Sequence, residues 1–148
     1  MDRIINNESV TICAILTAMI LDVYEIARLN LFTIMTTDRA IRTRLAGYGS
    51  YEEMVSRESS YYQALNRKFV EFQPVFVNAA TMLLMGGKIE NKAKGKYDLT
   101  VEGMEMAYKM TDRHEKVIES VREAAIRLEG MIRQRDTSTW YKDLKIVL

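Results

Sequence analysis

Cysteine, histidine and proline each occur only once in this sequence, and each scarcity narrows the range of functions. The single cysteine, Cys13, excludes an internal disulfide and fits a reducing compartment, so we expect a cytoplasmic protein. It lies in an apolar run without basic neighbours, which is typical of an inert thiol. One histidine and one cysteine, about a hundred residues apart, do not supply the three or four ligands of a zinc site, so we expect no metal.

Motifs for catalysis and nucleotide binding are equally scarce. His114 is expected on the apolar seam of a helix, where a structural role is commoner than general-base catalysis. Glu52 and Glu53 are adjacent, so on a helix they point in different directions and do not form a catalytic pair. The stretch "MGGKIE" contains Lys88 but lacks the earlier glycine and the hydroxyl of a P-loop. We therefore expect a protein without catalytic residues or cofactors, and not an enzyme.

The chain also lacks a long hydrophobic run and an excess of one charge. The longest apolar stretch, from Val10 to Leu21, contains two threonines and is followed by Asp22, well short of the ~20 residues that a membrane span needs. We expect no signal peptide and no membrane partner. With 21 Lys and Arg against 20 Asp and Glu, binding to nucleic acid would require a local basic patch.

The composition and the pattern of apolar residues predict a mainly helical single domain that covers residues 1–148. Seven glycines, one proline and 48% hydrophobic residues favour helices around one core. Apolar residues on most sides predict a central first helix to about Leu29, and the β-branched "LNLFTIMTT" predicts an extended or connecting segment. Asp38 should begin a short helix that ends at Gly47, and Ser50 with Glu53 forms a capping box for the next one.

The middle of the chain predicts helices that lead into a β-hairpin. One helix is expected over Tyr51–Ser56 and a second from Ser59 or Ser60 to Phe72, and Pro74 should begin a new helix that ends at Met85. Two short strands, Lys88–Glu90 and Lys96–Leu99, then form a hairpin with Gly95 at positive φ near its turn. A hairpin of this kind, at about residues 86–103, is typical of a wing. The predicted fold class is therefore mainly α with a small, winged-helix-like β-hairpin.

The C-terminal part predicts a long helix over about residues 101–135, capped by Thr100. Its apolar residues follow alternating steps of three and four, with a weak stretch around Thr111 and His114 where a short break is allowed. This seam either packs within the domain or pairs with another helix, including one from a second copy. Its candidate partner-contact residues are Met104, Ile118, Val121, Leu128 and Ile132. The tail, with its only tryptophan at Trp140, is expected to fold back on the body.

Two basic segments are candidates for contact with DNA or phosphate. Neutralising phosphates requires Lys or Arg, and some winged helices hold the DNA backbone with lysines of the wing. Exposed hairpins also carry lysines simply to prevent edge-to-edge strand pairing. The helix before the hairpin, "PVFVNAATMLLM", is too apolar to read bases, so it is a core element or a protein interface. DNA contact would therefore be secondary, through Arg39, Arg42, Arg44, Lys88, Lys92, Lys94 and Lys96.

The order of segments resembles a known family. "TTDRAIRTRL", "GSYEEMV", the "GGKIE" hairpin and the closing "AAIRLEGMIRQRDTSTWYKDLKIVL" are together similar to the middle component of three-component ABC systems, over essentially the whole chain. Lamassu-type antiphage systems are built this way. The resemblance implies a small non-enzymatic subunit that works beside an SMC-like coiled-coil ATPase and an effector, with the seam helix and the winged-helix-like half as contact surfaces.

The sequence leaves three candidate functions for this protein. The first is an adaptor subunit of an SMC-like defence complex, which the resemblance and the missing catalytic motifs favour. The second is a stand-alone winged-helix regulator that binds DNA, which the hairpin lysines favour and the pI of about 7.8 disfavours. An enzyme that works through carboxylates or tyrosines alone is the least favoured of the three.

Overall fold

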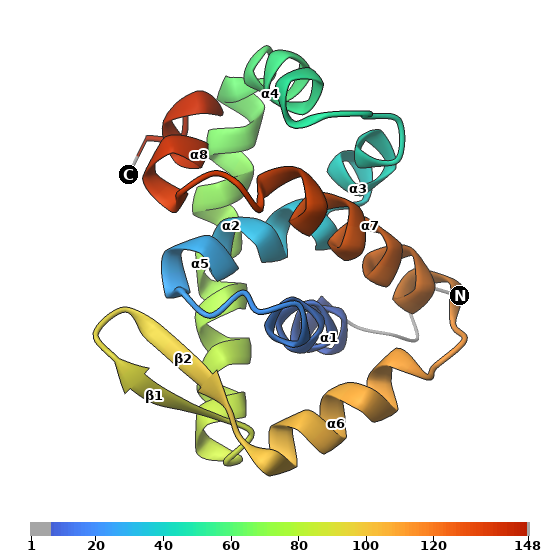
Figure 1. The fold of residues 1–148 in the computed structure, drawn as a ribbon, viewed down its shortest axis with the longest axis vertical. Coiled ribbons are helices and arrows are strands. Elements are labelled where there is room, and N and C mark those ends of the chain that lie inside the picture. Colours follow the sequence, from blue (N-terminus) through green and yellow to red (C-terminus); the bar gives the residue numbers. More distant parts are fainter. Residues whose placement is uncertain (1–6, 148) are drawn as a thin grey trace.

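The computed structural model describes residues 7–147, and it confirms a mainly helical fold with one small β-hairpin (Figure 1). The hairpin is antiparallel and forms a two-stranded sheet. In chain order the elements are α1 (Asn7–Ile20), α2 (Ile26–Thr37), α3 (Arg39–Leu45), α4 (Tyr51–Ser59), α5 (Tyr62–Met85), β1 (Ile89–Ala93), β2 (Lys96–Leu99), α6 (Val101–Thr111), α7 (Lys116–Ile132) and α8 (Thr137–Asp143).

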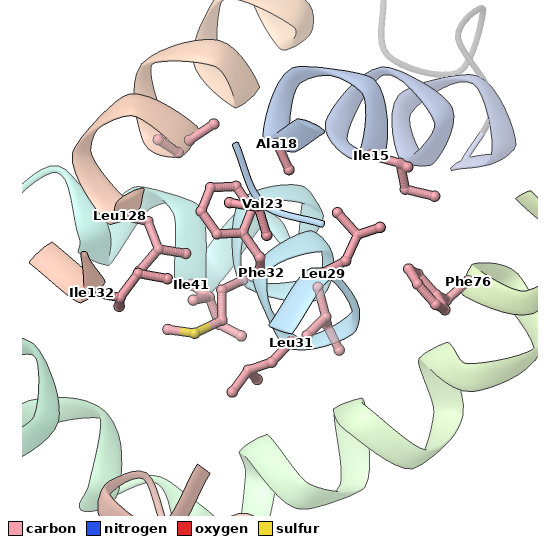
Figure 2. Packing of buried hydrophobic residues seen from close by; sticks show 14 of the residues in the cluster. Ile15, Ala18, Val23, Leu29, Leu31, Phe32, Ile41, Phe76, Leu128 and Ile132 are labelled. Atoms are coloured by element: carbon pink, nitrogen blue, oxygen red, sulfur yellow. The ribbon is translucent and has the colours of Figure 1, made fainter. Parts of the chain in front are cut away.

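Helix α1 lies at the centre of the fold and contacts α2, α5, α6 and α7 (Figure 1). Its side chains are buried on nearly every side, which is why its sequence is apolar all round. The core continues through α2, where Leu29 and Phe32 are completely buried, and reaches Phe76 of α5 and Leu128 of α7 (Figure 2). Residues from all the helices and from β1 belong to the same hydrophobic cluster.

The predicted first helix to Leu29 is wrong, because the chain turns between Ile20 and Ile26. Asp22 adopts a left-handed conformation with φ 67°, which ends α1. The predicted extended segment "LNLFTIMTT" is instead part of α2. Its buried threonines satisfy their hydroxyls on carbonyls of the preceding turn, as Thr33 does with the carbonyl of Leu29 at 2.6 Å, so they are compatible with a buried helix.

Helix α5 runs without interruption through Pro74, so the predicted separation into two helices is also wrong. Proline removes the N–H that would donate to the carbonyl of Val70. Both residues lie on the exposed side of α5, where water can replace the missing donor. Helix α4 likewise continues to Ser59, beyond the predicted end at Ser56.

The predicted long helix over 101–135 is divided into α6 and α7 by the connection Asp112–Glu115. A straight helix of that length would extend about 50 Å, much further than α1, and only one of its halves could pack there. The break lets α6 and α7 both contact α1. His114 lies in this connection with its side chain 89% exposed, and not on a buried seam.

The hairpin packs against the turn between α1 and α2. Its register pairs Ile89 with Leu99 and places Gly95 in the turn with φ 78°, as predicted. Tyr97 donates its N–H to the carbonyl of Tyr24 at 3.0 Å, and Ile26 donates its N–H to the carbonyl of Gly95 at 2.8 Å. Two helices, α3 and α4, separate α2 from α5, and α5 is followed directly by the hairpin.

Candidate functional site

Two of the three candidate arginines of α3 hold the fold together. Arg42 donates from Nε to the hydroxyl of Ser120 at 2.8 Å and from its guanidinium to the carbonyl of Thr37 at 2.9 Å. These bonds join α7 to the C-terminal end of α2, where a cation also complements the helix dipole. Arg42 is therefore oriented toward protein groups and does not present its guanidinium outward to a phosphate.

Arg44 forms an ion pair with a carboxylate that the sequence analysis missed. Its guanidinium donates two hydrogen bonds to Glu58, at 2.7 and 2.9 Å, and Glu58 is completely buried. The hydroxyl of Tyr48 donates to the same carboxylate. The hydrogen bonds between Arg44 and Glu58 raise the pKa of Arg44. Burial, together with the hydrogen bond to Glu58, raises the pKa of Tyr48. A buried carboxylate without its partner is strongly destabilising, so Arg44 has a structural role.

The remaining candidate cations do not converge on one surface. Arg39 is exposed on α3, whereas the lysines belong to the hairpin on the opposite side of α2 (Figure 1). Lys88 is half-buried, and Lys92 lies 3.8 Å from Asp98. Lys94 and Lys96 are exposed and take part in none of the ion pairs found within residues 7–147. The seven basic residues therefore do not form a continuous phosphate-binding patch.

The candidate seam is divided between the core and the surface. Ile118, Val121, Leu128 and Ile132 are at most 1% exposed. Helix α7 packs against α1, α2 and α3, so these four residues contact the chain's own core (Figure 2). Met104 instead lies on α6 and is 45% exposed. Of the predicted partner-contact residues, only Met104 is thus available to another protein.

An exposed, largely apolar face lies on α5, the helix that directly precedes the hairpin in the sequence. The opposite side of the helix is buried through residues such as Phe69, Phe76 and Leu83. No charged residue occurs from Phe72 to Gly87. We call this surface the α5 face and define it by its exposed, uncharged residues Val70, Pro74, Val77, Asn78, Thr81, Met82 and Met85.

A second, shorter apolar face lies on α6. We call it the α6 face, and it consists of Val101, Met104 and Tyr108, which follow one another at helical spacing. The start of α6 is joined to the end of α5 where Thr100 donates its hydroxyl to the carbonyl of Gly87 at 2.6 Å. Most of the exposed large apolar side chains thus belong to two adjoining helices. The sequence identified the apolar character of α5 but could not show which of its sides would be exposed.

The groups most often used in catalysis are not brought together. Burial raises the pKa of the Cys13 thiol, which lies 3.9 Å from the Thr17 hydroxyl. Exposed His114 lies 3.7 Å from a carboxylate oxygen of Glu119. Over the described part of the chain, no group of three or more His, Cys, Asp or Glu side chains is placed to hold a metal ion.

Comparisons with protein-family models, with curated proteins and with solved structures found no match. None of the helices within residues 7–147 is long and apolar enough to cross a membrane. The α5 and α6 faces are the most distinctive surfaces of the described chain.

Proposed function

We propose that this protein is a cytoplasmic, non-enzymatic adaptor that binds other proteins. In this proposal it is the small subunit of an SMC-like ATPase complex in antiphage or anti-plasmid defence, and it bridges the ATPase and an effector. The resemblance of its segments to the middle component of three-component ABC systems motivates the choice of partner. The observation that carries the proposal is the uncharged α5 face, at the position where a winged-helix protein would contact DNA.

The chemistry of the α5 face suits a protein partner better than DNA. A helix that reads the major groove needs Arg, Lys, Asn or Gln side chains, and the α5 face offers only Asn78. Val77 and Met85 are 55% and 84% exposed, so covering them would remove apolar surface from water at about 25 cal/mol per Å². Contiguous exposed apolar surface of this kind is typical of protein interaction sites.

The α6 face is the surface that we assign to the ATPase. Met104 is at its centre, with Val101 and Tyr108 on either side, and a methionine adapts to many partner shapes. Co-expression of this chain with an SMC-like ATPase encoded beside its gene should yield one complex in size-exclusion chromatography. Met104→Glu should weaken that complex, whereas Ile126→Glu on α7, which is also an exposed apolar position, should not. A chain that never co-elutes with the ATPase would contradict the proposal.

The alternative is a stand-alone winged-helix regulator, and the exposed Lys94 and Lys96 are the observation that favours it. A regulator would bind duplex DNA with strong salt dependence, and each phosphate contact would contribute about 0.9 to the slope of log K against log salt. Exchanging both lysines for glutamate would reduce that slope and the affinity. If the adaptor proposal is correct, the unmodified chain and this double variant should show the same weak binding to duplex DNA in fluorescence anisotropy.

A further inference from the structure

The connection between α6 and α7 lacks the local signals that usually end one helix and begin the next. Glu115, the residue before α7, makes no capping bond with its side chain, and Asp112, the residue after α6, keeps a right-handed helical backbone with φ −85° and ψ −4°. No glycine or proline occurs between Met104 and Glu129, although such residues commonly terminate helices. The packing of α6 and α7 on α1, and not the local sequence, therefore divides the helix.

The connection is also short, and its ion pairs join neighbours in sequence. Arg113 pairs with Glu115, and His114 lies 3.7 Å from Glu119. Since Asp112 already has helical dihedral angles and α7 begins at the next residue after Glu115, straightening the chain needs a backbone change at residues 113–115 only. A change confined to three residues is the kind of movement that a hinge makes.

A straightened helix could not cover α1 of its own chain. Helices α6 and α7 both contact α1 and pass it on different sides (Figure 1). Straightening would draw α7 and α8 away and expose side chains that are now buried, such as Ile118 and Leu128. A second copy that straightened in the same way would offer the missing helices and would need those of the first. Each copy therefore has the surface that the other requires.

The contacts that hold α7 and α8 would be the same in either arrangement. Arg28 donates to the carbonyls of Ile132 and Arg135 at 2.6 and 2.9 Å, and the hydroxyl of Tyr51 donates to the carboxylate of Asp143 at 2.7 Å. All the donors lie before the connection and all the acceptors lie after it. Exchange between two copies would thus replace each bond within a chain by an identical bond between chains.

The charges of the connection oppose straightening in the single chain. In a continuous helix Arg113 would follow Lys109 by four residues and precede Lys116 by three, so three like charges would be neighbours. Its ion pair with Glu115 would also be lost, because residues two apart on a helix do not face each other. The monomer is therefore the favoured form at low concentration, and exchange requires mass action.

From these observations we propose that two copies of this chain exchange α7 and α8, while residues 113–115 become helical and join α6 to α7. The joined helix covers residues 101–132 and is about 48 Å long. The dimer is closed and symmetric, because each copy gives and receives the same element. This proposal does not depend on the ATPase or on the α5 and α6 faces.

A proline at position 116 distinguishes the two arrangements. Lys116 is the first residue of α7, where proline is well tolerated, and Glu115 already has the extended backbone that precedes a proline, with φ −60° and ψ 139°. In the joined helix the same proline would be internal, which disfavours each connection about a hundredfold. Lys116→Pro should therefore remain monomeric. Lys116→Ala is the matched control, since alanine suits both forms and should dimerise at least as readily as lysine.

Arg113→Glu should have the opposite effect. It replaces the repulsion from Lys109 and Lys116 in the joined helix by attraction, and it removes the ion pair with Glu115 that favours the monomer. After refolding from guanidinium chloride at ~500 μM, it should give at least tenfold more dimer than the unmodified chain. Light scattering coupled to size-exclusion chromatography measures the mass, which is 17.1 kDa for one copy. Arg113→Glu that stays monomeric would overturn the proposal, and so would dimerisation of Lys116→Pro equal to that of Lys116→Ala.

Cross-linking shows whether a dimer is formed by exchange. Cys13→Ala removes the only thiol, and Glu52→Cys and Arg135→Cys are then placed on separate chains. These two side chains are an ion pair at 2.7 Å, and they lie on opposite sides of the connection in sequence. In chains refolded together, a short bis-maleimide should join position 52 of one copy to position 135 of the other. Dimers that do not cross-link in this way would have formed through another surface and would overturn the exchange.

Discussion

Replacing Gly103 with alanine is expected to destabilise the protein, although alanine is the better helix former. Gly103 lies in the first turn of α6, which packs directly on the backbone of Lys88. A Cβ atom at position 103 would lie 1.8 Å from the carbonyl oxygen of Lys88 and 2.8 Å from its carbonyl carbon. That oxygen also accepts a hydrogen bond from the N–H of Thr100 at 3.1 Å, and it shares the hydroxyl hydrogen of Thr100, at 2.9 Å, with the carbonyl of Gly87. The clash therefore involves backbone that is already bonded.

The loss of stability expected for Gly103→Ala is the balance between the damaged contact with Lys88 and the better helix propensity of alanine. Separating α6 from Lys88 would break two hydrogen bonds, each worth about 1 kcal/mol, and overpacking adds about 2 kcal/mol. The alanine contributes at most about 1 kcal/mol through helix propensity. The free energy of unfolding should thus fall by about 3 kcal/mol. With a slope of about 2 kcal/mol per M urea, the unfolding midpoint would fall by about 1.5 M.

Gly130 offers a matched control for the same substitution. It lies on the exposed side of α7, and a Cβ atom there would have no other atom within 4 Å. Gly130→Ala should therefore raise the free energy of unfolding by about 0.5–1 kcal/mol. Urea unfolding followed by far-ultraviolet circular dichroism and by the fluorescence of Trp140 measures both variants. A Gly103→Ala variant as stable as the unmodified chain, or a change of both variants in the same direction, would refute the clash with Lys88.

Three further predictions concern buried charge, the proline and pH. Glu58→Gln should lower the free energy of unfolding by about 3 kcal/mol, because Arg44 loses its carboxylate partner, and an unchanged urea midpoint would contradict this. Pro74→Ala should raise the free energy of unfolding by up to about 3 kcal/mol, the difference in helix propensity between the two residues, which includes the new hydrogen bond to Val70. A lower thermal midpoint would show that α5 needs the proline. The stability contributed by the buried tyrosines should be full below about pH 10 and be lost above it, because unfolded phenols lose protons more readily than folded ones. Tyrosinate absorbance should then appear only with unfolding for the three tyrosines whose pKa burial raises most, Tyr48, Tyr51 and Tyr141.

The features that depend on neighbouring residues could be predicted from the sequence. Asp38, Ser50 and Thr100 cap their helices as expected, with side chains that accept from backbone N–H groups at about 3 Å. The capping box differs in one detail, since the carboxylate of Glu53 accepts from the N–H of Gly49 and not from that of Ser50. Strand pattern and turn glycines likewise located the hairpin, because these signals are contained within a few residues.

The features that depend on distant residues could not be predicted in the same way. The turn after α1 is fixed by two hydrogen bonds with the hairpin, about 70 residues later in the chain, in which the Tyr24 carbonyl accepts and the Ile26 N–H donates. Pro74 is tolerated because its side of α5 is exposed, which only the packing of the other side determines. The same applies to the α5 face, whose apolar residues in the sequence are equally compatible with burial. Glu58 had no local signal either, since its partner Arg44 belongs to a different helix.

The contact of the hairpin with the α1–α2 turn has a consequence for the order of folding. The donor at Ile26 and the acceptor at Gly95 can meet only after most of the chain is available, so this contact has a large sequence separation. Helix α1 also completes its burial only when α6 and α7 pack against it. During synthesis the N-terminal helices therefore remain partly exposed until the hairpin and the last helices have formed. Fragments that end before residue 95 should lack a cooperative unfolding transition, because in this protein the centre of the fold is completed last.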